Sequence, residues 1–274
     1  MKILSDFDGV FTTPEGEAAS CASYLDELLG DRALLSALRA EVSAAPDRHG
    51  WMVSDSGRTV ISAYADEDPY IYNNGVVAAL YERGPAAVLA RLRDSGFVKY
   101  SDLSIHCFEE GTRRYRAAHA SHAEEAALAR VAQWLSDGHE VVIVSNSSTD
   151  RIEAILRSAG FEPGQRGLRV RGNALKFRLG EEPAELPARA SFGARPIALR
   201  RPSFWKILSE ETPDAFIGDV LSLDLALPAA ARRTDPRFAG LRLFLRRRGY
   251  TPAWALDACH DAAIDVVEAL PDLR

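Results

Sequence analysis

The most informative part of the sequence is Lys2-Ile3-Leu4-Ser5-Asp6-Phe7-Asp8-Gly9-Val10-Phe11-Thr12. Its apolar run leads directly into two aspartates and a glycine. Side chains alternate between the two faces of a strand, so Asp6 and Asp8 are expected on one side of its carboxyl end. Two carboxylates so close together repel each other, and a divalent cation between them offsets this electrostatic free energy. Mg2+ prefers a few carboxylate oxygens together with waters and a phosphate. The alternative is a simple turn, because Asp-Gly is a common turn pair.

Two further apolar runs end in small polar or acidic residues. Residues 141–144 (Val-Val-Ile-Val) lead into Ser145 and Asn146, and residues 215–218 (Ala-Phe-Ile-Gly) lead into Asp219, with Asp224 five positions later. Ligands of an open parallel sheet bind outside the carboxyl ends of its strands. The three endings are therefore expected to meet at one crevice.

The order of these motifs resembles the haloacid dehalogenase (HAD) superfamily of phosphohydrolases. The resemblance lies in Asp6-x-Asp8-Gly9-Val10, the strand ending in Ser145, and Gly218-Asp219-x-x-x-x-Asp224, and it covers residues 1–12 and roughly 120–274. It implies a Rossmann-like core with a mobile, mainly helical cap that is inserted after the first motif. The implied cofactor is Mg2+, and the implied substrate is a small phosphorylated metabolite.

The resemblance also implies roles for the acidic residues. Asp6 is the expected nucleophile, which would form an aspartyl-phosphate, and Asp8 is the expected general acid and base. The expected Mg2+ ligands are Asp6, the backbone carbonyl of Asp8, and Asp219, while Asp224 would bind a metal-bound water. For Asp224, an acid at a helix N-terminus is an equally weighted alternative.

The phosphoryl group is expected to contact the second motif and a cation. The Ser145 hydroxyl and the backbone amides of Asn146 and Ser147 would donate to it, although an N-cap role is the alternative for Ser145. The superfamily places a lysine, often followed by proline, before the Gly-Asp strand. Arg201-Pro202 matches that position best. The rival cations are Arg200, Lys206 and, less favoured, Lys176, and each has the alternative of a solvated surface charge.

Asp8 also bears on the type of reaction. A dehalogenase of this superfamily does not need an acid two residues after the nucleophile, whereas phosphoryl transfer does, because the leaving alkoxide needs a proton. The sequence therefore favours Mg2+-dependent hydrolysis of a phosphomonoester. A phosphomutase with the same core residues and a catalytically idle HAD-fold binding module stay open as alternatives.

Alternating strands and helices predict an α/β fold with a mainly parallel, Rossmann-like sheet. The long gap after the first strand predicts a helical cap domain over 15–118, inserted into a core of 1–14 and 119–274. We further expect a helix over 22–42 that is broken near Gly30-Asp31, a helix over 76–94 with Gly84-Pro85 as a break or a fresh start, and a helix over 123–135 with Ser121 as N-cap. A β-hairpin or edge strand is expected over 168–179, and a surface loop over 181–196.

Composition narrows the function classes. The chain has 274 residues, 47% of them hydrophobic, and a net charge of −6, which argues against a nucleic-acid surface despite the short cluster Arg246–Arg248. Three widely spaced cysteines, an N-terminus unlike a signal peptide and no run long enough for a bilayer lead us to expect a cytoplasmic protein. The sequence leaves the oligomeric state open.

Overall fold

The computed structural model describes residues 1–55, 58–119, 123–165 and 167–273. The chain divides into two compact units. Unit 1 comprises Met1–Thr13 and His122–Arg274, and unit 2 comprises Pro14–Ser121. Each unit has its own hydrophobic core, so each is described separately.

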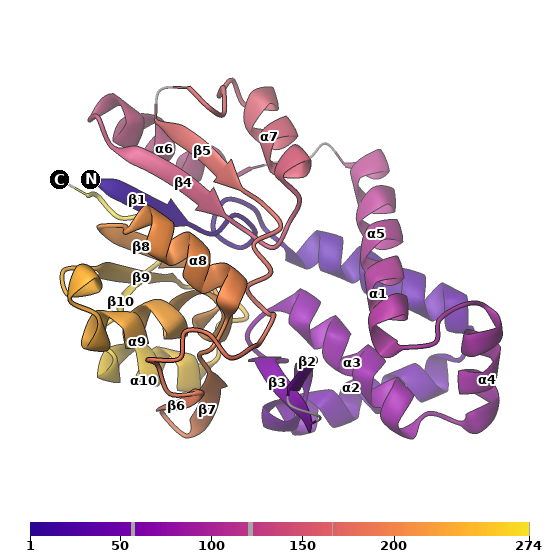
Figure 1. Cartoon of the computed structure of the whole chain (residues 1–274). Coiled ribbons are helices and arrows are strands. Elements are labelled where there is room, and N and C mark those ends of the chain that lie inside the picture. Colours follow the sequence, from indigo (N-terminus) through magenta and orange to yellow (C-terminus); the bar gives the residue numbers. More distant parts are fainter. Residues whose placement is uncertain (56–57, 120–122, 166, 274) are drawn as a thin grey trace. The chain divides into compact units, whose positions relative to one another are not determined.

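Unit 1 is built on a six-stranded sheet with the order β10-β9-β8-β1-β4-β5 (Figure 1). All pairings recorded for this sheet among the described residues are parallel. Its strands are β1 (Lys2–Ser5), β4 (Glu140–Val144), β5 (Leu168–Arg171), β8 (Ala215–Gly218), β9 (Arg242–Arg246) and β10 (Asp265–Val267). Residues 141–144 and 215–217 are fully buried, as expected for strands of a parallel sheet covered on both faces. The predicted α/β fold with a parallel sheet is confirmed.

Helices connect the strands of unit 1. They are α6 (Glu125–Ser136), α7 (Thr149–Ser158), α8 (Pro202–Glu211), α9 (Ala226–Thr234) and α10 (Ala253–Asp261), with the short turns η2 (Leu221–Leu225) and η3 (Pro236–Phe238). Apolar residues of α6 and α7, including Trp134 and Ile152, share one core with Ile3 of β1 and Val141 of β4. Burial against the sheet is what stabilises such amphipathic helices, because short helices are marginal alone.

The loop that follows β1 is anchored in this same core. Phe7, Val10 and Phe11 are fully buried, and the rings of Phe7 and Phe11 stack with centroids 5.7 Å apart. The Phe11 amide donates to the Phe7 carbonyl at 2.7 Å, so the chain makes one helical turn here. These apolar anchors fix the loop on both sides of Asp8 and Gly9.

Unit 2 is mainly helical. Its helices are α1 (Glu15–Leu29), α2 (Arg32–Ala44), α3 (Pro69–Arg83), α4 (Ala86–Asp94) and α5 (Tyr100–Ala118), with the short turn η1 (Pro46–Arg48) and an antiparallel hairpin of β2 (Gly50–Asp55) and β3 (Arg58–Tyr64). Leu25, Leu35, Leu80 and Leu103 lie in its core. The hairpin was not anticipated, because turn residues between 46 and 57 obscure its short strands.

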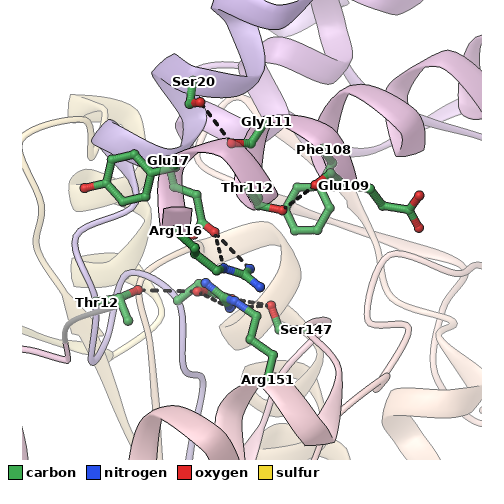
Figure 2. A network of polar contacts seen from close by, with 12 residues as sticks. Thr12, Glu17, Ser20, Phe108, Glu109, Gly111, Thr112, Arg116, Ser147 and Arg151 are labelled. Atoms are coloured by element: carbon green, nitrogen blue, oxygen red, sulfur yellow. Dashed lines mark hydrogen bonds and ion pairs between the residues drawn. The ribbon is translucent and has the colours of Figure 1, made fainter. Parts of the chain in front are cut away.

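Helices α1 and α5 of unit 2 are held together at close range. A Cβ atom at Gly111 of α5 would lie 2.4 Å from the Cα of Cys21 on α1, so only glycine fits there. Arg116 of α5 donates to the Glu17 carboxylate of α1 at 2.9 Å, and Ser20 donates to the Gly111 carbonyl (Figure 2). The first and last helices of the unit are thereby paired.

The expected breaks at Gly30-Asp31 and Gly84-Pro85 are confirmed, because α1 ends at Leu29 before α2 and α3 ends at Arg83 before α4. The edge-strand alternative for 168–179 is confirmed for residues 168–171, which form a parallel strand at the sheet edge, and the hairpin alternative is not. Two further local expectations differ from the structure. The expected surface loop over 181–196 contains β6 (Arg189–Phe192), which pairs with β7 (Arg195–Ala198). The N-cap position of α6 is Glu124, and the expected N-cap Ser121 lies outside the described residues.

No helix among the described residues has the length and apolar character needed to cross a membrane.

Candidate functional site

The three strand ends that the sequence singled out are neighbours in the sheet of unit 1. Ser5 of β1 pairs with Ile143 of β4 on one side and with Ile217 of β8 on the other. The Asp6 amide continues this ladder by donating to the Ile217 carbonyl at 2.9 Å. Asp6, Ser145 and Asp219 therefore follow adjacent strands at one edge.

Three carboxylates gather at this edge. Asp6, Asp219 and Asp224 each offer an oxygen within 4.8 Å of the others. They are 9%, 3% and 0% exposed, so water screens their mutual repulsion poorly. A set of carboxylate oxygens fits a hard cation such as Mg2+, which accepts few protein ligands and keeps several waters.

Two glycines allow these carboxylates to approach the backbone. Gly9 has φ +74°, and a Cβ there would lie 1.9 Å from Asp219 Oδ2. A Cβ at Gly218 would lie 2.3 Å from the Cβ of Asp224. Any other residue at either position would displace an acidic group, and Gly9 also adopts a backbone conformation that suits glycine.

The cation of the site is Lys176. Its side chain is fully buried, and its Nζ lies 2.9 Å from Asp6 Oδ1 and 2.5 Å from Asp224 Oδ1. Burial alone would lower the pKa of this ammonium group, but the carboxylates of Asp224 and Asp6 raise that pKa overall. Lys176 thus carries a fixed positive charge between the two acids.

Lys176 reaches the site on a loop that is fastened to the segment after β4. The Lys176 amide donates to Asn146 Oδ1 at 2.7 Å, and the Ala174 amide donates to the Ser145 carbonyl at 2.9 Å. Asn173 adopts a positive φ of 53°, which asparagine tolerates better than most residues. These contacts replace the predicted hairpin and direct the lysine toward the carboxylates.

Arg201, the preferred candidate for the phosphate-binding cation, directs hydrogen-bond donors to the protein backbone. Arg201 is fully buried, and its guanidinium donates to the backbone carbonyls of Ala198 and Lys176. It therefore supports the loop that carries Lys176. Of the other rivals, Arg200 donates to the carbonyls of residues 184 and 186, and the Lys206 side chain is 75% exposed, at 3.9 Å from Glu210.

Asp6 has an unusual electrostatic environment. Burial raises the pKa of its carboxyl group, and the nearby carboxylates of Asp224 and Asp8 raise it further. The Lys176 ammonium opposes this shift, and the resulting pKa is about 7. A buried carboxyl group whose pKa lies near neutral pH is typical of catalytic residues.

Asp8 lies in a different environment from Asp6. Its carboxylate accepts from Ser147 at 2.6 Å, from Arg151 at 2.8 and 2.9 Å, and from Thr12 at 3.3 Å. Figure 2 shows Thr12, Ser147 and Arg151. Burial would raise the pKa of Asp8, but Arg151 and these hydrogen bonds lower it overall. Sequence reasoning missed Arg151, whose only signal is its place four residues after Ser147 at the start of α7.

The predicted phosphate-binding residues begin the segment after β4. The Ser145 side chain is buried, and its Oγ accepts from the Ser147 amide at 3.2 Å. Ser148, rather than Ser145, is the N-cap of α7, since its hydroxyl accepts from the Arg151 amide. The N-cap alternative for Ser145 is therefore wrong. The Asn146 side chain accepts from the Lys176 amide through Oδ1, so that oxygen holds the Lys176 backbone.

Comparisons with known proteins give similarities at the level of structure. No protein-family model and no curated protein matches the chain. One similar solved structure is the HAD-hydrolase YfnB from Bacillus subtilis bound to magnesium, with 13% identity over 96% of this chain and 98% of that chain, and a TM-score of 0.43. Another is 2-haloacid dehalogenase from Pseudomonas syringae pv. Tomato DC3000, with 14% identity over 89% and 86% of the two chains and a TM-score of 0.38.

Proposed function

We propose that this chain is a HAD-type hydrolase that removes phosphate from a small phosphorylated metabolite. The observation that carries the proposal is the grouping of Asp6, Asp219, Asp224 and Lys176 at one edge of a parallel sheet. Burying three acids beside one lysine costs free energy, so a purely structural role does not account for the group. The arrangement fits a carboxylate that attacks a phosphorus atom.

Asp6 is the proposed nucleophile. Its carboxylate forms a bond to phosphorus while the bond from phosphorus to the ester oxygen breaks, and an aspartyl-phosphate results. Lys176 offsets the charge of the nucleophile and the transferred phosphoryl group. Asp6, Asp219 and the Asp8 carbonyl would hold Mg2+, and Asp224 would bind a metal-bound water; the ion would supply further positive charge at the phosphoryl group.

Asp8 is the proposed acid and base. The leaving alkoxide takes a proton from Asp8, and Asp8 later takes a proton from the water that hydrolyses the aspartyl-phosphate and restores Asp6. The contacts of Asp8 with Arg151 and Ser147 favour the ionised form, which is the form needed for the second step. In the first step, Asp8 must be protonated in order to donate to the leaving alkoxide. Its carboxylate must therefore release Arg151 and bind a proton instead.

The substrate class and compartment are part of the same proposal. The site needs only a phosphomonoester, so a small phosphorylated metabolite is the proposed partner, and no nucleic acid or membrane is required. Cys21, Cys107 and Cys259 are buried and form no disulfide among the described residues, and a cytoplasmic location is part of the proposal.

The test is phosphate release from a panel of sugar phosphates, nucleotides and other small phosphomonoesters, with Mg2+ and with a chelator. We expect release that needs Mg2+ and that falls by about 10³-fold or more in Asp6→Asn, since the nucleophile is removed. Asp257→Asn, exposed on α10, is the matched control and should behave as the native protein. Equal release by Asp6→Asn would contradict the mechanism. No release from any compound would favour the phosphomutase or idle-module alternatives.

A further inference from the structure

The net charge of the chain argues against a nucleic-acid surface, which leaves the cluster Arg246–Arg248 without a role. This cluster lies at the same sheet edge as the site. Strand β9 pairs with β8, and Leu245 is the partner of Gly218. Arg246 therefore ends β9 beside the point where Asp219 follows β8. We call the segment Arg246–Tyr250 the β9 extension.

Two arginines of the β9 extension contact the backbone of the loop after β1. Arg246 donates to the Val10 carbonyl. Arg248 donates to the Gly9 carbonyl and, at 3.0 Å, to the Thr12 carbonyl. Three carbonyls of the loop that carries Asp8 thus accept from guanidinium groups, whose fixed fork of donors suits such multiple contacts.

Glu124 joins both arginines. Its carboxylate pairs with Arg246 and, at 2.7 Å, with Arg248, while its amide donates to the Phe11 carbonyl at 2.7 Å. The side chains of Arg246 and Arg248 are only 7% and 13% exposed. Burial would raise the pKa of Glu124, but the two arginines lower it overall. Burying two guanidinium groups is costly unless their donors are used. Here the loop and Glu124 accept from both terminal nitrogens of Arg246 and from all three nitrogens of Arg248, while Arg246 Nε has no hydrogen-bond partner among the described residues.

Arg247 provides an internal contrast. Its side chain is 52% exposed and pairs with Glu268, which is 75% exposed, at 3.3 Å. Arg246 is the last residue of β9, and Arg247 and Arg248 follow it. The cluster is therefore divided between two residues that contact the loop, of which Arg246 is buried and Arg248 is partly buried, and one ordinary surface charge.

The β9 extension also contacts the acidic cluster directly. The Tyr250 hydroxyl donates to Asp219 Oδ2 at 2.7 Å. A hydrogen bond to a carboxylate fixes its rotation and reduces the freedom that metal binding would otherwise remove. One short segment thus contacts both the loop after β1 and an acid of the third motif.

We propose that the β9 extension is a positioning element of the site, in which Arg246 and Arg248 fix the loop of residues 9–12 and Tyr250 orients Asp219 for Mg2+. The kinetic part of this inference rests on the proposed function. The metal-binding part does not, because Mg2+ affinity can be measured without a substrate.

The first experiment measures Mg2+ binding by calorimetry in the full chain. Tyr250→Phe removes one oxygen atom, and we expect its Mg2+ dissociation constant to rise by about 10-fold, the lower end of the effect of losing a group that orients a metal ligand. Tyr81→Phe is the matched control, since Tyr81 donates to the Phe97 carbonyl in unit 2 at 2.7 Å. An unchanged constant for Tyr250→Phe would overturn the role of Tyr250.

The second experiment measures turnover on a substrate found by the phosphate-release panel. Arg248→Gln should lower kcat by about 10-fold or more with KM within about two-fold, because the loop loses its order while the phosphate site is kept. Arg248→Lys, which keeps the charge without the fork, should recover only part of this loss, and Arg247→Gln should equal the native protein. A kcat of native size in both Arg248 variants would overturn the role of Arg248.

The two proposals fail in different ways. A native protein that binds Mg2+ but releases no phosphate would contradict the proposed hydrolase, while weaker Mg2+ binding by Tyr250→Phe would still support the positioning role. Normal phosphate release together with unchanged Mg2+ binding and turnover in the Tyr250 and Arg248 variants would overturn the positioning role alone.

Discussion

At the scale of single residues, one ammonium group holds two buried carboxylates together. Lys176 lies between Asp6 and Asp224, and all three are buried. Without the lysine, two negative charges would face each other where water cannot screen them. Removing one partner of such a buried arrangement typically costs about 3–5 kcal/mol of stability, because an uncompensated charge is left behind.

The substitution Lys176→Met tests this role. We expect phosphate release to fall by about 10²–10³-fold, the usual effect of removing a group that stabilises developing charge. The melting temperature should also fall, and Mg2+ should restore more of it than in the native protein, since the metal would replace the missing charge. Lys206→Met, at an exposed position on α8, is the control and should leave both quantities unchanged. Equal activity of the two variants would contradict the assignment of Lys176.

The acidic residues of the site could be predicted from the sequence, whereas the sequence favours Lys176 least among the candidate cations and gives no prediction for Arg151. Asp6, Asp219 and Asp224 each follow an apolar run, and the sheet brings such endings together. Lys176 follows an irregular loop whose path depends on hydrogen bonds to the segment after β4, so no local pattern marks it. Arg201 matched the expected position along the chain, but its donors are used on backbone carbonyls.

At the scale of elements, Glu211 joins the end of α8 to two strands. Its carboxylate pairs with Arg169 at 2.7 Å and Arg171 at 3.0 Å, both on β5, and with Lys2 of β1 at 3.6 Å. The side chain is 4% exposed although its partners are partly solvated. The hydrogen bond from Arg169 lowers the pKa of Glu211 against the effect of burial.

The pH dependence of stability follows from this lowered pKa. A carboxyl group with a lower pKa in the folded state stabilises the fold at pH values above its unfolded pKa, and the effect is lost as pH falls through the folded pKa. We expect Glu211→Gln to lower the free energy of unfolding by about 1–3 kcal/mol at pH 7, with the difference from the native protein shrinking below about pH 4. Urea unfolding at several pH values measures this.

Glu210→Gln is the control for that measurement. Glu210 is 43% exposed and pairs with Arg171 at 2.7 Å on the surface, so its loss should cost less than about 1 kcal/mol at any pH. A difference between native protein and Glu211→Gln that stayed constant from pH 7 to pH 3 would contradict the ionic origin of the contribution of Glu211.

The regular elements were more predictable than the segments between them. The strands that follow the three apolar runs are present, because a continuous apolar stretch suits a sheet buried on both faces. The pair of β6 and β7 was missed, since each strand has only four residues. Both strands contain an arginine, one contains a proline, and several of their positions are exposed, so they lack a clear apolar pattern. Its pairing depends on contacts that no periodicity in the sequence records.

At the scale of the whole molecule, each unit has a hydrophobic core among the described residues, and these two cores share no residue. The core of unit 1 is built around the sheet and includes Phe7, Trp134 and Ile217. The core of unit 2 is built from helices and includes Leu35, Leu80 and Leu103. All three residues of the acidic cluster belong to unit 1. Metal binding is therefore expected to depend on the first core and not on the second.

The substitution Leu80→Ala, at a fully buried position of α3, tests this separation. Truncating a buried leucine costs about 2–5 kcal/mol, because apolar contacts are lost and a cavity is left. We expect amide hydrogen exchange to quicken over residues 14–119, while exchange in β1, β4 and β8 and the Mg2+ dissociation constant stay native. Val131→Ala in the core of unit 1 is the converse variant and should quicken exchange in the sheet. Equal quickening of both units by Leu80→Ala would mean that the two cores unfold as one, so that stability lost in either unit would also be lost at the metal site.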